Sequence, residues 1–138
     1  MTRRPRVLIE EWLPAQAIGV ECMRERGSSS ALAPTTYLHV WWARRPLTVS
    51  RAAVLGSLLP ADFDRPTFER LLGFYASSKS IIENQGLVES VRSGNEQRIV
   101  NPHGPRAFSA RIQNDGLQNA KVSMGSLWAD SPVVIDPM

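Results

Sequence analysis

The pattern that most restricts the fold of this chain is an amphipathic repeat between residues 66 and 76. Phe68, Leu71, Leu72 and Tyr75 recur at i, i+3, i+4 and i+7, which places them on one side of a helix. Weaker repeats of the same kind predict helices at about 7–13, 15–26 and 46–59. We also predict a short helix at about 86–92 and a helix at about 117–127. Helices must therefore supply most of the hydrophobic core.

Strand candidates are few by comparison. Only the aromatic residues 37–42 and the apolar residues 132–137 are typical of strands. The second segment is typical of a parallel sheet covered by helices on both faces, and such a strand needs neighbours. We therefore predict a mainly α fold with one or two short strands. Residues 1–130 would form a helical domain, and residues 131–138 would be the first strand of an α/β (Rossmann-like) domain whose remainder is missing.

The composition is typical of a soluble globular protein, since 43% of the 138 residues are apolar and 21% are charged. There is no apolar run of about 18 residues, so we predict no transmembrane helix and expect a cytoplasmic protein. The single cysteine, Cys22, excludes an internal disulfide. One cysteine and two histidines also argue against a zinc site made by the protein alone.

The charge is unevenly distributed along the chain. Residues 1–60 contain eight arginines and four glutamates, a balance of +4. Residues 61–138 contain eight basic and nine acidic residues, a balance of −1. This asymmetry indicates an anionic partner near the first half.

The most distinctive stretch is Leu38-His39-Val40-Trp41-Trp42-Ala43-Arg44-Arg45-Pro46-Leu47. It brings an extended aromatic segment, two cations and the start of the helix predicted from residue 46 to one place. A helix N-terminus presents unpaired N–H groups and a partial positive charge, and the two arginines add full charges. A carboxylate or a phosphate would therefore bind there.

Individual side chains in this stretch have competing interpretations. Trp42 shares a face of the extended segment with Leu38 and Val40, and we predict that it belongs to the core. Trp41 and His39 lie on the opposite face, where packing and function remain open alternatives.

The cations of the same stretch suit an anionic ligand. We predict that Arg45, which precedes Pro46, faces an anion. Trp41 could stack on bases while Arg44 and Arg45 contact phosphates, so His39, Trp41 and Arg44 are the predicted nucleic-acid-binding residues.

Other sequence features favour structural roles. Asp62 and Asp64 precede the helix predicted from residue 66, and capping of that helix is the better account of them. Asn101-Pro102-His103-Gly104 is predicted to be a turn with an exposed histidine. The sequence contains no Gly-x-Ser-x-Gly motif, phosphate-binding loop or Cys–His nucleophile arrangement.

Four stretches together resemble a known family. They are Arg6-Val7-Leu8-Ile9-Glu10-Glu11, the stretch from His39 to Leu47, Arg106-Ala107-Phe108, and Val134-Ile135-Asp136-Pro137. The pattern is similar to that of prokaryotic adenine-specific DNA methylases that carry a zinc ribbon and begin with a domain of unknown function. The resemblance covers nearly the whole chain, with the loosest match in residues 77–130. It implies a DNA partner and, for many such methylases, a place in phage defence.

The resemblance also implies a cofactor, S-adenosylmethionine, in the full-length family. Arg45, Pro46 and Leu47 match the stretch that opens a helix beside the methionine end of this cofactor. Asp136 and Pro137 match the start of the family's glycine-rich loop, where Met138 stands in place of an aromatic residue. The loop glycines and the catalytic Asn/Asp-Pro-Pro-aromatic motif are absent. We therefore expect this chain alone to contain no catalytic residue and to bind neither cofactor nor metal.

The leading hypothesis is an N-terminal fragment of an adenine-specific DNA methyltransferase, truncated or split from its catalytic part. It would contribute to the cofactor and DNA side of the site and would be inactive alone. A methylase chain encoded downstream would then be its partner. The alternatives are a non-enzymatic, basic nucleic-acid-binding module and a remnant gene product without independent function.

Overall fold

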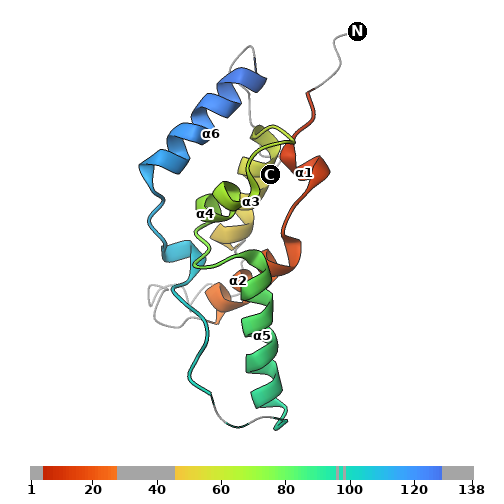
Figure 1. The fold of residues 1–138 in the computed structure, drawn as a ribbon, viewed down its shortest axis with the longest axis vertical. Helices are drawn as coiled ribbons and strands as arrows, with labels where there is room; N and C mark the ends of the chain where they lie inside the picture. Colours follow the sequence, from red (N-terminus) through yellow and green to blue (C-terminus); the bar gives the residue numbers. More distant parts are fainter. Residues whose placement is uncertain (1–4, 28–45, 96, 98, 129–138) are drawn as a thin grey trace, which may run out of the picture.

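A computed structural model of the chain describes residues 5–27, 46–95, 97 and 99–128 (Figure 1). These residues form α1 (Leu8–Glu11), α2 (Ala15–Arg26), α3 (Leu47–Leu58), α4 (Arg65–Leu72), α5 (Ser78–Arg92), the short 3-10 helix η3 (Ala107–Ser109) and α6 (Asn114–Leu127). The prediction of a mainly α protein is confirmed. Within the described ranges there is no strand, only an isolated antiparallel bridge between Val7 and Pro60. Both predicted strands, 37–42 and 132–137, lie outside these ranges.

Helices α2, α3 and α4 occupy the middle of the molecule, as Figure 1 shows. Helix α2 packs against α3 and α5, α1 packs against α3, and α4 packs against both α3 and α6. Helix α5 extends toward one end of the molecule and α6 lies toward the other. The core side chains that are almost completely buried come from all of these helices, from η3 and from the residue after α3: Leu8, Ala17, Ala52, Leu59, Phe68, Leu71, Leu72, Ile81, Ala107 and Ala120.

The predicted helices at 15–26 and 46–59 match α2 and α3 to within one residue at each end. Helix α1 is shorter than the predicted 7–13, and α6 begins three residues before the predicted position. Asp64 accepts a hydrogen bond from the backbone N–H of Thr67 at 2.9 Å, so its predicted capping role is confirmed.

The two largest differences from the predicted boundaries are at the end of α4 and the start of α5. The helix predicted to reach residue 76 ends at Leu72, because Gly73 adopts a left-handed conformation with φ of 87° and stops it. Tyr75 therefore lies in the connection to α5 rather than on α4. Helix α5 begins at Ser78, well before residue 86, and Ser77 caps it by accepting from the N–H of Ser80.

No helix in the described part of the chain is long and apolar enough to cross a membrane.

Candidate functional site

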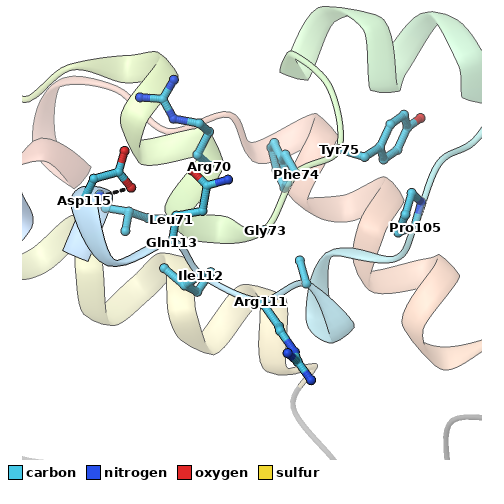
Figure 2. A pocket seen from close by; sticks show the side chains of 12 residues that line it. Arg70, Leu71, Gly73, Phe74, Tyr75, Pro105, Arg111, Ile112, Gln113 and Asp115 are labelled. Atoms are coloured by element: carbon cyan, nitrogen blue, oxygen red, sulfur yellow. Dashed lines mark hydrogen bonds between the residues drawn. The ribbon is translucent and has the colours of Figure 1, made fainter.

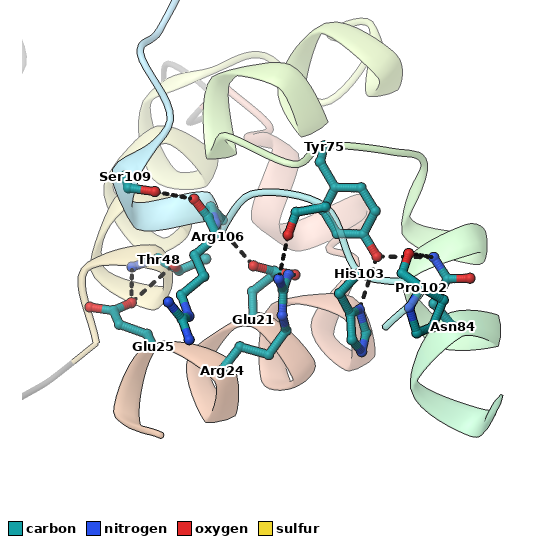
Figure 3. A network of polar contacts seen from close by, with 12 residues as sticks. Glu21, Arg24, Glu25, Thr48, Tyr75, Asn84, Pro102, His103, Arg106 and Ser109 are labelled. Atoms are coloured by element: carbon teal, nitrogen blue, oxygen red, sulfur yellow. Dashed lines mark hydrogen bonds and ion pairs between the residues drawn. The ribbon is translucent and has the colours of Figure 1, made fainter. Parts of the chain in front are cut away.

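A network of polar side chains connects α2 to α3 and to residues 101–109 (Figure 3). Three of its members, Glu21, Arg24 and Glu25, come from α2 at spacings of three and four residues, so they share one side of that helix. That side faces the start of α3 and η3. The site is therefore built on α2, a regular helix of 12 residues.

The N-terminus of α3 already holds a carboxylate. Glu25 accepts from the backbone N–H of Leu47 at 2.8 Å and of Thr48 at 3.3 Å, and from the Thr48 hydroxyl at 3.1 Å. These N–H groups have no partner within the helix, and the helix dipole adds to their attraction for an anion. Pro46, the N-cap residue of α3, provides no side-chain cap, so Glu25 takes that role from a neighbouring helix.

Glu21 is an acidic residue buried within the protein, with only 1% of its surface exposed. Its carboxylate accepts from the backbone N–H of Ala107 at 3.0 Å and forms an ion pair with Arg24. Arg24 also donates to the carbonyl oxygen of Gly104 at 2.6 Å, and its guanidinium lies 5.4 Å from the ring centre of Tyr75. A buried carboxylate is tolerated only when it is paired in this way, and here the pairing fastens residues 104–107 to α2.

A chain of hydrogen bonds continues from Tyr75 into residues 101–103. The amide of Asn84 donates to the hydroxyl oxygen of Tyr75 and to the carbonyl of Pro102, both at 3.1 Å. The Tyr75 hydroxyl lies 3.0 Å from Nδ1 of His103. Since this hydroxyl oxygen already accepts from Asn84, its proton is best directed to Nδ1, which leaves the His103 proton on Nε2.

His103 differs from its predicted exposed state. It is half-buried, and its Nε2 atom is buried without a hydrogen-bond partner among the described residues. Burial lowers the pKa of His103 below its usual 6.5, and the nearby Arg24 lowers it further. The predicted turn at this position is supported by the Asn101 side chain, which accepts from the His103 backbone N–H at 3.1 Å.

Most polar groups of this network are engaged with one another or with backbone, Nε2 of His103 being the exception among the described residues. Cys22, on the same helix as Glu21, is a half-buried thiol whose pKa is raised by burial. Within the described ranges, no group of three or more His, Cys, Asp or Glu residues could hold a metal ion.

A cavity of about 420 Å³ lies between the end of α4 and the segment leading into α6 (Figure 2). Leu71, Phe74 and Ile112 give it apolar walls. Arg70 and Arg111 also border it, but their guanidinium groups extend to opposite sides, as Figure 2 shows. The two cations therefore do not converge on a common ligand position.

Of the residues predicted to bind cofactor or nucleic acid, the structure describes two. Pro46 and Leu47 open α3, as predicted, and the N–H of Leu47 is the group bound by Glu25. The other predicted site residues lie outside the described ranges: His39, Trp41, Arg44, Arg45, Asp136 and Pro137.

Sequence reasoning did not single out Glu21 and Glu25. One signal was present, because Glu21 lies on the same side of the predicted helix as Ala17 and Ile18, which are apolar. A charged residue on an apolar helix face is typical of a buried, paired group.

Comparison with known proteins gives one match. No curated protein and no solved structure matches the chain. Residues 12–73, which run from the residues before α2 to the glycine that ends α4, are similar to a family described as protein of unknown function, DUF1156.

Proposed function

We propose that this chain is a helical module of an adenine-specific DNA methyltransferase, placed on the cofactor and DNA side of the active site. The catalytic motif and the glycine-rich loop would be supplied by a methyltransferase domain outside these 138 residues. The module is not catalytic by itself. The match of residues 12–73 to a domain of unknown function is compatible with this proposal, as is the sequence pattern from His39 to Leu47.

The observation that carries the proposal is the carboxylate held at the start of α3. The methionine end of S-adenosylmethionine also carries a carboxylate, and a helix N-terminus binds such a group through its free N–H groups. Glu25 occupies the N–H groups of Leu47 and Thr48, so the cofactor would have to replace it there. Arg45 would then contribute a full positive charge next to Pro46 and Leu47. Asp136 and Pro137 would begin the loop on the other side of the cofactor.

Removal of Glu25 tests this site directly. We expect S-adenosylmethionine at millimolar concentration to leave the melting temperature of the wild-type chain unchanged, because Glu25 holds the N–H groups. The Glu25→Ala variant should gain thermal stability from the cofactor, since a ligand that binds the folded state stabilises it. It should gain none from 5′-methylthioadenosine, which lacks the carboxylate.

A matched control is available in α5. Glu69 accepts from the backbone N–H of Ser78 at 3.2 Å and so serves α5 as Glu25 serves α3. Unlike α3, α5 also has a side-chain cap of its own, Ser77, so Glu69→Ala leaves that helix start occupied and should show no response to S-adenosylmethionine. If Glu25→Ala shows no response either, the proposed cofactor contact at α3 is wrong.

The methyltransferase role itself needs a second chain. We would add the present chain to a separately produced methyltransferase domain that has the glycine-rich loop and the Asp/Asn-Pro-Pro-aromatic motif, and measure methyl transfer to adenine in DNA. Transfer should depend on both chains and should fall when Arg45 is replaced by alanine. Equal transfer with and without the present chain would contradict the proposal.

DNA is the proposed macromolecular partner, and His39, Trp41 and Arg44 are the residues proposed to contact it. If the chain binds DNA by itself, as the alternative of a non-enzymatic module requires, binding should weaken steeply with salt. The double variant Arg44→Ala/Arg45→Ala should then bind several-fold more weakly. Unchanged affinity in this variant would remove the basic stretch from the interface.

A further inference from the structure

Another cavity, of about 380 Å³, lies between the second half of α5 and residues 99–103. Its size is within the range of small-molecule sites in proteins, roughly 300–1,000 Å³. Its walls are mainly apolar and are formed by Val88, Val91, Ile99 and Pro102. The cavity shares no residue with the start of α3, where the cofactor contact is proposed, so it is a separate site.

The polar groups in the wall of this cavity are mostly hydrogen-bond donors. His103, Asn101 and Arg92 line it, and none of the described residues that line it is acidic. The side-chain oxygen of Asn101 accepts from the backbone N–H of His103, so its NH2 group remains as a donor. The remaining polar side chain, Gln85, donates its amide N–H to Glu89 at 2.7 Å. The cavity therefore offers donors and one positive charge to a ligand.

The donor that most needs a partner is Nε2 of His103. The Tyr75 hydroxyl is directed to the other ring nitrogen, Nδ1, so the proton lies on Nε2, on the part of the ring that faces away from Tyr75 (Figure 3). This N–H is buried and has no partner among the described residues. A buried donor without an acceptor destabilises the folded state. Since the His103 ring forms part of the cavity wall, a ligand in the cavity can supply the acceptor.

We propose that this cavity binds a small carboxylate with an apolar body. One carboxylate oxygen accepts from Nε2 of His103, and Arg92 supplies the opposite charge, which strengthens the contact. The apolar body lies against Val88, Val91 and Ile99. Ile99 is 40% exposed without a ligand, and removal of such apolar surface from water adds to the affinity.

Phenylacetate is a suitable probe, because it joins a carboxylate to an aromatic ring. We would titrate it into the chain labelled with 15N-histidine and follow the Nε2 resonance of His103 by NMR. The other histidine, His39, is identified from the spectrum of His39→Gln. The His103 resonance should shift as its N–H gains an acceptor, with a Kd of about one millimolar, as expected for so small a ligand.

Phenylacetamide tests the requirement for charge, since it has nearly the same shape and is neutral. It should bind at least threefold more weakly than phenylacetate. No shift of the His103 resonance at about 20 mM phenylacetate, or equal affinity for the two probes, would overturn the proposal.

Arg92 allows the charge to be removed without disturbing the core, because its side chain is exposed. Arg92→Gln should weaken phenylacetate binding at least fivefold and change phenylacetamide binding less than twofold. Arg92→Lys should retain most of the affinity, since the charge remains. Arg111→Gln is the matched control, because Arg111 is an exposed cation that borders the other cavity, and it should bind phenylacetate as the wild type does. Wild-type affinity in Arg92→Gln, or equal weakening in Arg92→Gln and Arg111→Gln, would contradict a carboxylate site in this cavity.

Discussion

At the scale of single residues, the buried carboxylate of Glu21 is the contact on which the 104–107 segment most depends. We expect Glu21→Ala to lower the free energy of unfolding by about 3 kcal/mol, because it leaves the N–H of Ala107 and the charge of Arg24 without their partner. Urea denaturation monitored by circular dichroism measures this loss.

The control for Glu21 is a glutamate whose ion pair is exposed to solvent. Glu83 lies 3.9 Å from Lys79, and both side chains are mostly exposed. Glu83→Ala should therefore cost less than about 0.5 kcal/mol. Similar losses in the two variants would mean that the Glu21 contacts contribute little.

We expect the stability of the folded protein to depend on pH through His103. Its pKa in the folded state lies below the usual 6.5, so the unfolded chain takes up the proton first as pH falls. Stability should therefore decrease below about pH 6.5 and stop decreasing below the pKa of the folded state. A protonated His103 would also donate from Nδ1 and could no longer accept from the Tyr75 hydroxyl.

The pH effect is measured by urea denaturation at pH 7.5 and at successively lower pH, for the wild type and for His103→Gln. Glutamine cannot titrate, so the variant should lose less stability than the wild type over this range. Parallel curves for the two proteins would show that His103 titrates alike in the folded and unfolded states.

At the scale of elements, the sequence predicted the helices whose apolar residues follow a clear period. The boundaries of α2 and α3 could be predicted because Pro14 and Pro46 mark their starts and Gly27 and Pro60 follow their ends. The first half of α5 could not be predicted, because Ser77 and Ser78 are typical of a loop and Ile81 is its one buried apolar residue.

In the candidate site, features set by neighbouring residues could be predicted from the sequence, and contacts between distant residues could not. The start of α3 was predicted from local sequence, whereas its cap, Glu25, is 22 residues away along the chain. The contact between Glu21 and Ala107 spans 86 residues, and no periodicity within one element can report it. Long-range contacts of this kind depend on how α2 packs against η3.

Two glycines in different elements should respond oppositely to the same substitution. Gly73 has a φ of 87°, and a methyl group there would be 2.3 Å from the carbonyl oxygen of Ala107. Gly73→Ala should therefore lower stability by about 2 kcal/mol or more. Gly86 lies inside α5 with open space around it, so Gly86→Ala should raise stability by up to about 1 kcal/mol. Thermal melts of both variants would reveal the difference, and a loss in both would contradict the assigned environment of Gly86.

At the scale of the whole molecule, the helices are held with unequal strength. Helix α2 contacts α3, α5 and η3, and three of its residues also bind other segments through the polar network. Helix α6 packs mainly on α4, where Ala120 is its one buried residue. Beyond this contact, the indole N–H of Trp128 donates to the carbonyl oxygen of Leu58 at 2.9 Å and fixes the end of α6 to the end of α3.

This difference predicts that α6 opens without the rest of the protein unfolding. Amide hydrogens of α6 should exchange with solvent faster than those of α2, since few apolar contacts must be broken to expose them. Trp128→Phe should speed exchange in α6 further and leave α2 unchanged, because it removes the hydrogen bond to Leu58 while keeping an aromatic ring. Trp12→Phe is the control. Trp12 contacts Phe68 of α4 in the core, so its replacement should speed exchange in α4 and should not act on α6 alone. Equal protection of α2 and α6 in the wild type would mean that the protein opens only as a unit, with α6 as much a part of the core as α2.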